Sequence, residues 1–71
     1  MKEVKNKLST RIRELREEKG LLQSQLATQL NFTQTTISKW ELGDREPNAD
    51  TIILLAQFFG VTTDYLLGIE D

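Results

Sequence analysis

Residues 23–41 read QSQLATQLNFTQTTISKWE, and this stretch decides the fold. Apolar residues recur at helical spacing over residues 23–30 and again over residues 34–41: Leu26, Ala27, Leu30, Ile37 and Trp40. Only residues 31–33 separate the two runs. The stretch therefore predicts two short helices joined by a tight turn.

The residues around the turn suit two helices that cross closely. Ala27 is small at the crossing, where a larger side chain would overpack the contact by roughly 1–3 kcal/mol. Asn31 is the kind of non-glycine residue that best tolerates a left-handed backbone. We expect Phe32 to enter the core and Thr33 to cap the second helix. These features predict a helix-turn-helix.

Three further helices are expected outside this stretch, over residues 9–19, 49–59 and 63–67. A glycine follows each of them, and Asn48 and Thr62 precede the last two as N-caps. No sustained alternation of β-branched residues is present. The sequence therefore predicts an all-α protein with five helices.

With 71 residues, the chain is expected to form one domain over residues 8–68, between a polar N-terminal arm (1–7) and a C-terminal tail (69–71). It has no Cys and no His, which removes the usual zinc ligands and the Ser–His and Cys–His nucleophile pairs. We therefore expect no metal, no cofactor and no enzymatic activity.

Charge is distributed unevenly along the chain, whose net charge is −2. All nine cations lie in residues 1–45 with six acids, a net of +3, whereas residues 46–71 hold five acids and no cation. Ordinary surface charge is one interpretation; a basic end that approaches a polyanion is the other. No apolar run reaches the roughly 20 residues of a membrane span, and no secretory h-region is visible, so we expect a cytoplasmic protein without membrane contact.

The helix over residues 34–41 separates into two faces when its positions are set 100° apart. Ile37 and Trp40 fall on one side, and the opposite side holds Gln34, Thr35, Ser38 and Lys39. Gln can bond adenine, Lys can reach guanine, and the Thr methyl can contact thymine. On an isolated helix such a face is usually only solvated; inside a helix-turn-helix we expect it to contact DNA bases.

The spacing resembles the helix-turn-helix of the phage repressor and Cro family, also called the XRE family. The likeness covers about residues 8–68 and includes RIRELREEKGL (11–21), ISKWELGDREPNADTI (37–52) and FFGVTTDYLLG (58–68). The resemblance implies a compact, lambda-repressor-like bundle of five helices whose third helix enters the DNA major groove. It implies sequence-specific binding of double-stranded DNA by a transcriptional regulator, which we expect to be a repressor.

The resemblance also suggests roles for residues outside the third helix. It places Gln23 on a DNA phosphate, and it pairs Arg16 with Glu41 as a structural ion pair between the first and third helices. Further candidates for phosphate contacts are Thr33, Thr36, Arg11, Arg13 and Arg45.

The chain departs from the family pattern at three positions. Leu22 stands where relatives have a Thr or Ser cap, and Asp44 and Glu46 stand where many have basic residues. A lost cap costs roughly 1 kcal/mol. Two acids near the DNA backbone weaken non-specific affinity, so we expect DNA binding to depend on dimerisation or on base contacts.

The helix over residues 49–59 is apolar almost all the way round. Its core side is expected to hold Ile52, Leu55, Ala56 and Phe59. Leu54 and Phe58 fall nearly opposite, where either the last helix covers them or a second copy does. We predict a homodimer that binds an inverted-repeat operator and whose interface contains Leu54, Phe58, Tyr65 and Ile69.

Two other classes of function were weighed. A protein-interaction adaptor or an antitoxin-type module would use the same fold, and the net acidity favours it. An enzyme is disfavoured, because Glu14, Glu17 and Glu18 fit the solvated face of one helix. We expect no small-molecule ligand in this domain.

Overall fold

A computed structural model describes residues 6–71 of the chain. Within these residues the protein is entirely helical, with no β-strand. The helices are α1 (Leu8–Glu18), α2 (Gln23–Leu30), α3 (Gln34–Leu42), α4 (Ala49–Phe59) and α5 (Thr63–Leu67). The all-α fold of five helices is thus confirmed.

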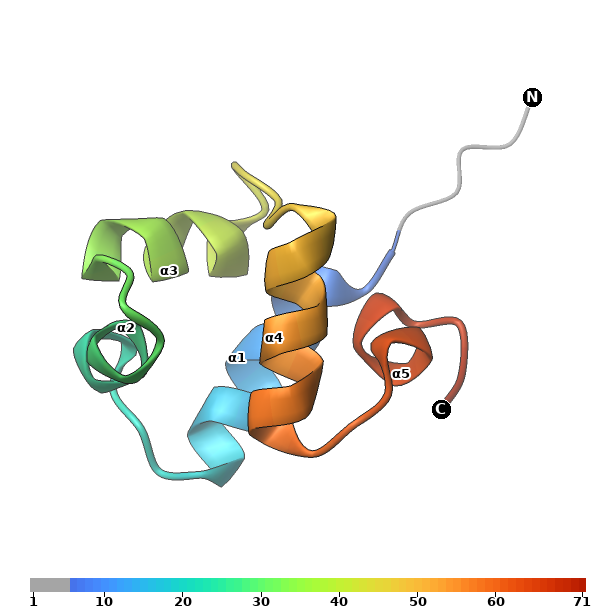
Figure 1. Cartoon of the computed structure of the whole chain (residues 1–71). Helices are drawn as coiled ribbons and strands as arrows, with labels where there is room; N and C mark the ends of the chain where they lie inside the picture. Colours follow the sequence, from blue (N-terminus) through green and yellow to red (C-terminus); the bar gives the residue numbers. More distant parts are fainter. Residues whose placement is uncertain (1–5) are drawn as a thin grey trace.

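The helices pack around α1, which contacts α3, α4 and α5. In Figure 1, α4 crosses in front of α1 at the centre of the molecule, with α2 and α3 to one side and α5 to the other. Helix α2 packs against α3, and α5 also packs against α4. This arrangement leaves the outer sides of α2 and α3 free of other helices.

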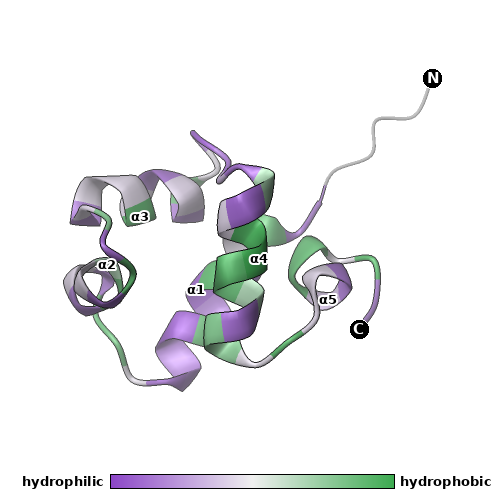
Figure 2. Cartoon of the chain, in the orientation of Figure 1, coloured by the Kyte–Doolittle hydropathy of each residue, from purple (hydrophilic) through white to green (hydrophobic). Residues whose placement is uncertain are grey.

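Every helix contributes a side chain that is fully shielded from solvent. These are Ile12, Leu26, Ile37, Leu55 and Leu66, one from each helix in order. Apolar residues gather where the helices meet and are densest on α4, as the hydropathy colouring shows (Figure 2). Burying an aliphatic side chain of this size contributes about 1.5–3 kcal/mol, so the five together bind the helices into one core.

The turn between α2 and α3 has the predicted conformation. Asn31 adopts a left-handed backbone with φ of 62°, and Ala27 is buried where the helices cross. The Phe32 ring packs edge-on against Trp40 at a centroid distance of 4.9 Å. The hydroxyl of Thr33 caps α3 by accepting the N–H of Thr36 at 3.2 Å.

Three helices have their predicted bounds, α1 is shifted by one residue at both ends so that it ends at Glu18, and α3 is longer by one residue. Helix α1 begins at Leu8 after Lys7, which makes no side-chain cap, and the side-chain oxygen of Asn6 accepts the N–H of Leu8 at 3.0 Å, a contact that the sequence interpretation missed. Helix α3 continues to Leu42 and ends at Gly43, whose φ is 80°. Of the predicted N-terminal arm, residues 1–5 lie outside the described part of the chain.

Leu22 provides no side-chain cap for α2, as expected. Its backbone N–H instead donates to the side-chain oxygen of Gln25 at 2.8 Å, which is one half of a capping box. The helix start therefore recovers part of the stabilisation that the missing hydroxyl would supply.

The third helix is fixed to the first by an ion pair between Arg16 and Glu41. Arg16 Nε donates to Glu41 Oε2 at 2.6 Å and Nη2 donates to Oε1 at 3.0 Å. The two side chains are only 11% and 4% exposed. The hydrogen bonds that Arg16 donates to Glu41 raise the pKa of Arg16 above its usual value, so the guanidinium stays charged throughout the accessible pH range.

Removing one partner of this pair should therefore lower the free energy of unfolding far more than removing one partner of an exposed ion pair. We expect Arg16→Met to lower the free energy of unfolding by roughly 3–5 kcal/mol, because it leaves a buried carboxylate unpaired. Arg13→Met is the matched control, since Arg13 is exposed and pairs with Glu17 at 3.5 Å, and it should cost under about 1 kcal/mol.

Urea denaturation of both variants measures the difference. Replacing both charges together, in Arg16→Met/Glu41→Leu, should recover much of the loss, since no lone charge stays buried. Equal stabilities for Arg16→Met and Arg13→Met would contradict the structural role of the pair.

Candidate nucleic-acid interface

Helix α3 presents a polar outer face because its other face is fixed in the core. Ile37 is fully buried and Trp40 nearly so, which determines how the helix is turned about its axis. On the opposite side, Gln34, Thr35 and Lys39 are exposed. Ser38 is half-buried, so its hydroxyl is less accessible than the sequence suggested.

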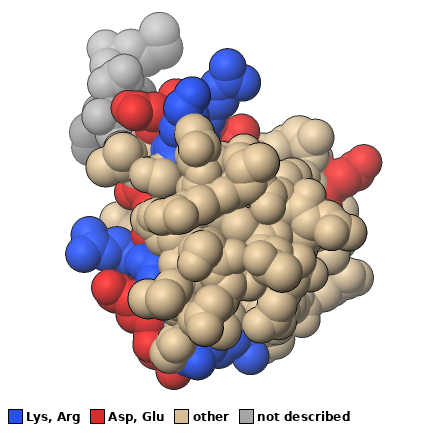
Figure 3. Space-filling view, turned by 90° about the vertical axis from the view of Figure 1, so that its left-hand side faces the viewer, with Lys and Arg blue, Asp and Glu red and all other residues tan. Residues whose placement is uncertain are grey.

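The surface around α2 and α3 is polar but almost uncharged. Helix α2 has no charged residue, and α3 has only Lys39 and the buried Glu41. Seen from the side of the molecule that carries α2 in Figure 1, the centre of the surface is free of charged side chains, and both basic and acidic side chains lie at its margins (Figure 3). The exposed Asp44 and Glu46 follow α3 in the chain, so carboxylates lie at one margin of the surface that would face DNA.

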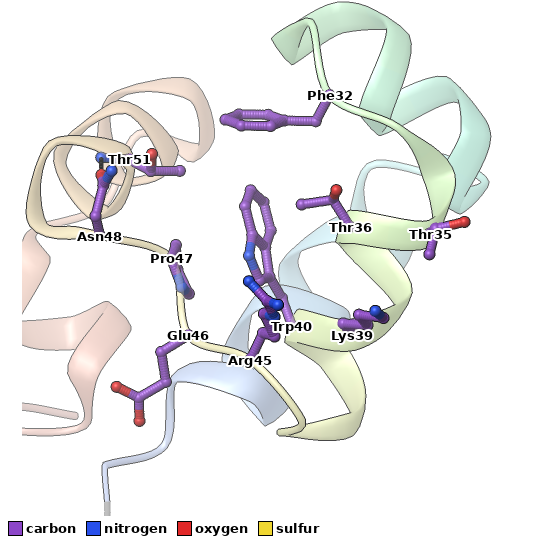
Figure 4. A pocket seen from close by; sticks show the side chains of 10 residues that line it. All are labelled: Phe32, Thr35, Thr36, Lys39, Trp40, Arg45, Glu46, Pro47, Asn48 and Thr51. Atoms are coloured by element: carbon purple, nitrogen blue, oxygen red, sulfur yellow. Dashed lines mark hydrogen bonds between the residues drawn. The ribbon is translucent and has the colours of Figure 1, made fainter.

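A groove runs between α3 and the beginning of α4. Its volume is about 410 Å³, and it is lined by Phe32, Thr35, Thr36, Lys39, Trp40, Arg45, Glu46, Pro47, Asn48 and Thr51. Figure 4 shows Lys39 and Thr36 projecting from α3, Asn48 and Thr51 on the opposite wall, and Arg45 beside Trp40. The groove thus brings the predicted contacts Thr35, Thr36, Lys39 and Arg45 together.

The hydroxyls and cations of this region are suited to binding an anion. The hydroxyls of Thr33 and Thr36 lie 2.9 Å apart at the start of α3. A helix N-terminus presents unpaired N–H groups and the positive end of the helix dipole. The exposed Lys39 and Arg45 line the adjacent groove together with the exposed Glu46, so two cations face one carboxylate there and the chemistry fits a phosphate beside the third helix.

Gln23 begins α2 and lies next to the ion pair. It is half-buried, and its Nε2 donates to Glu41 Oε1 at 3.0 Å. An amide nitrogen carries two hydrogens, so this bond leaves a second N–H for another acceptor. Sequence interpretation missed the contact, because nothing in the local pattern links residues 23 and 41.

Arg11 is not a surface arginine, so the expectation of a phosphate contact there was wrong. Its side chain is turned inward from α1, and the residue is 9% exposed. Its Nη1 donates to the backbone oxygens of Tyr65 and Glu70. Arg13 is exposed but lies on α1 beside Glu17, and it does not line the groove.

The face predicted for a second copy is only partly exposed. Leu54 is 40% exposed and Ile69 is 72% exposed. Phe58 and Tyr65 are half-buried and pack against the core, Phe58 through an edge-on contact with Phe59 at 5.1 Å. Ile53, which the sequence interpretation did not select, is exposed next to Leu54.

Within residues 6–71, no group of three or more acidic side chains is placed to hold a metal ion. No helix in the same residues is long and apolar enough to cross a membrane.

Comparison with known proteins agrees with this geometry. The model of the family described as Helix-turn-helix matches residues 12–66. The HTH-type transcriptional activator BcrR of Enterococcus faecalis is 44% identical over 61 residues, which are 86% of this chain and 30% of that protein. The HTH-type transcriptional regulator ImmR of Bacillus subtilis is 36% identical over 64 residues, 90% of this chain and 50% of that protein. The chain thus spans half or less of the length of these relatives.

Solved structures lead to the same assignment. The P22 c2 repressor, in complex with a synthetic operator, superimposes with a TM-score of 0.80 at 28% identity, covering 89% of this chain and 96% of that one. A transcriptional regulator from Listeria innocua superimposes with a TM-score of 0.86 at 26% identity, covering 96% of this chain and 64% of that one. The chain therefore belongs to the phage-repressor-like (XRE) family of helix-turn-helix domains.

Proposed function

We propose that the chain binds double-stranded DNA in a sequence-specific manner, with α3 in the major groove, as the DNA-binding domain of a transcriptional regulator. One observation carries the proposal: the outer face of α3 is polar and exposed while its inner face is locked into the core. A helix held in this way can present the same side chains to every DNA site.

The proposed base contacts follow from side-chain chemistry. Gln34 has the amide that pairs with adenine N6 and N7, and Lys39 can donate to guanine O6 or N7. Thr35 offers a methyl group to thymine, and Ser38 can donate or accept according to the base. All four residues lie on the outer side of α3.

The proposed phosphate contacts surround this face. Gln23 and Thr33 lie at the starts of α2 and α3, and Thr36 and Arg45 line the groove beside α3. Such contacts fix the position of the helix on the duplex but carry no sequence information. Arg11 and Arg13 are left out of the proposal for the reasons given above.

We further propose that the domain acts as a homodimer on an inverted repeat. Support comes from Leu54 and Ile69, which are large apolar side chains left exposed beside α4 and α5. A twofold dimer would bury them and place two copies of α3 on half-sites about one DNA turn apart. Phe58 and Tyr65 would add to this interface the parts of their side chains that the core leaves exposed.

Repression is the mode of regulation that we propose, through occupation of a promoter. A solved structure of similar fold is named a repressor, although one relative is named an activator. These relatives are named as regulators, which is not a class of enzyme, so we propose binding rather than catalysis. Because the ligand is genomic DNA, the cytoplasm is the proposed compartment.

Selection of bound duplexes from a random DNA pool tests the function itself. We expect an enriched inverted repeat with half-sites about one turn apart. Anisotropy titration of the selected duplex at two salt concentrations should show affinity that falls steeply with salt. A pool without enrichment, with weak binding abolished by moderate salt, would favour the protein-interaction alternative.

Lys39→Met tests the role of the third helix in base recognition. We expect a loss of about 1–3 kcal/mol in binding to the selected duplex and relaxed preference at one position of each half-site. Arg13→Met is the matched control, because Arg13 is an exposed cation on α1 that pairs with Glu17 and does not line the groove. A uniform loss across all sequences, with a reduced salt slope, would instead make Lys39 a phosphate contact.

Leu54→Glu tests the proposed dimer. The charge should abolish self-association in sedimentation equilibrium without unfolding the protomer, since Leu54 is already 40% exposed. Leu22→Glu is the control, because Leu22 is also exposed but lies before α2. A wild-type chain that stays monomeric at high concentration, with and without DNA, would rule the dimer out.

A further inference from the structure

Leu42 is a large apolar side chain on a helix whose other exposed residues are polar. It is 72% exposed, and α3 includes it because the helix runs one residue beyond its predicted end. Of the large apolar side chains that are exposed in residues 6–71, it is the one that lies within α2 or α3. A single exposed leucine is common on protein surfaces, so its place on the helix decides whether it has a role.

The place of Leu42 is on the outer face of α3. Measured from the first residue of the helix, with positions about 100° apart, it falls at about 80°, between Ser38 at about 40° and Thr35 at about 100°. Ile37 and Trp40, which are buried, lie on the other side of the helix. Leu42 therefore continues the surface that carries the proposed base contacts, one turn beyond Ser38.

The backbone at Leu42 is fixed by the residues that follow it. Gly43 ends the helix with φ of 80°, and its N–H donates to the carbonyl of Trp40 at 3.2 Å. The N–H of Asp44 donates to the carbonyl of Lys39 at 3.0 Å. This cap uses backbone groups and the left-handed conformation of Gly43, so it does not require an apolar side chain at Leu42. The side chain is also not among those that form the core or pack against it.

The surroundings of Leu42 on α3 indicate what it can contact. Side chains on a helix lean toward its N-terminus, so the patch that Leu42 covers lies over the turn that holds Ser38 and Lys39. That turn belongs to the surface proposed to enter the major groove. Base-pair edges in this groove present hydrogen-bonding groups and one apolar group, the C5 methyl of thymine. An exposed leucine on this surface gains most where it meets that methyl, because both groups leave water together.

We propose that Leu42 is a specificity-determining residue that recognises a thymine of the bound DNA by packing against its C5 methyl group. The proposal rests on the proposed function, because it needs the outer face of α3 in the major groove. Leu42 lies about 10 Å beyond Thr35 along the helix axis, and base pairs are about 3.4 Å apart, so we expect the two residues to contact different base pairs. The apolar contact would favour thymine over cytosine, which has no methyl group there.

Replacing thymine by uracil removes only the C5 methyl and therefore tests this contact directly. Each thymine of the duplex that the wild type selects is replaced singly, and anisotropy measures the binding of the wild type and of Leu42→Ala. At one thymine we expect uracil to lower wild-type affinity by about fourfold, the factor for burying one methyl-sized group. Leu42→Ala should bind the thymine duplex more weakly than the wild type, and uracil at that position should change its affinity by less than about twofold.

Three further variants separate this contact from its neighbours. Leu22→Ala is the matched control, because Leu22 is 64% exposed and lies before α2, and it should respond to uracil as the wild type does. Leu42→Met keeps an apolar side chain of similar volume and should retain the response to uracil. Thr35→Ser removes a different methyl from α3 and should leave the response at the thymine assigned to Leu42 unchanged. Circular dichroism checks that each variant is folded.

Two results would overturn the proposal in different ways. A duplex may be selected in which no thymine responds to uracil, or in which Leu42→Ala responds as the wild type does at every position; DNA binding would then stand and Leu42 would be an ordinary surface residue. A random pool that yields no selected duplex would contradict the proposed function itself, and the role of Leu42 would fall with it.

Discussion

A single carboxylate, that of Glu41, joins the three helices on which DNA binding depends. It accepts two hydrogen bonds from Arg16 of α1 and one from Gln23 of α2, and it belongs to α3 itself. Because Glu41 is 4% exposed, it cannot exchange these partners for water without opening the core. This buried contact therefore fixes the angle between α3 and the rest of the domain. It also orients the Gln23 amide proposed for a phosphate.

Electrostatics explains how a chain with a net charge of −2 can approach DNA. The acids are not absent: Glu41 is neutralised by Arg16, whereas the exposed Asp44 and Glu46 follow α3, and Glu46 lines the groove beside it. The surface of α2 and α3 is left with amides, hydroxyls and few charges (Figure 3). Such a surface gains little from non-specific attraction, so the proposed binding would depend on fitted base contacts and on the proposed pairing of two copies. The proposed dimer and the proposed specificity thus depend on each other.

Most of the local structure could be predicted from the sequence, because its causes lie within a few residues. The turn at Asn31, the caps at Thr33, Asn48 and Thr62, and the buried side of α3 all follow from spacing and backbone preference. The hydrogen bond from the Leu8 N–H to the Asn6 side chain was missed, because the helix was expected to begin one residue later. Arg11 was misassigned for a deeper reason. Its partners lie 54 and 59 residues away and are backbone carbonyls, which any residue type supplies, so no sequence pattern records them.

In the proposed function, the outer face of α3 binds DNA while α4 and α5 face away from it. Chemical-shift mapping tests this most directly: the isotope-labelled chain is titrated with its selected duplex, and the shift of each backbone amide is followed. The account predicts the largest shifts at Gln34, Thr35, Lys39 and the start of α2, with Leu54 and Ile69 responding only where two copies pair. Shifts concentrated on α4 and α5, with α3 unchanged, would contradict it.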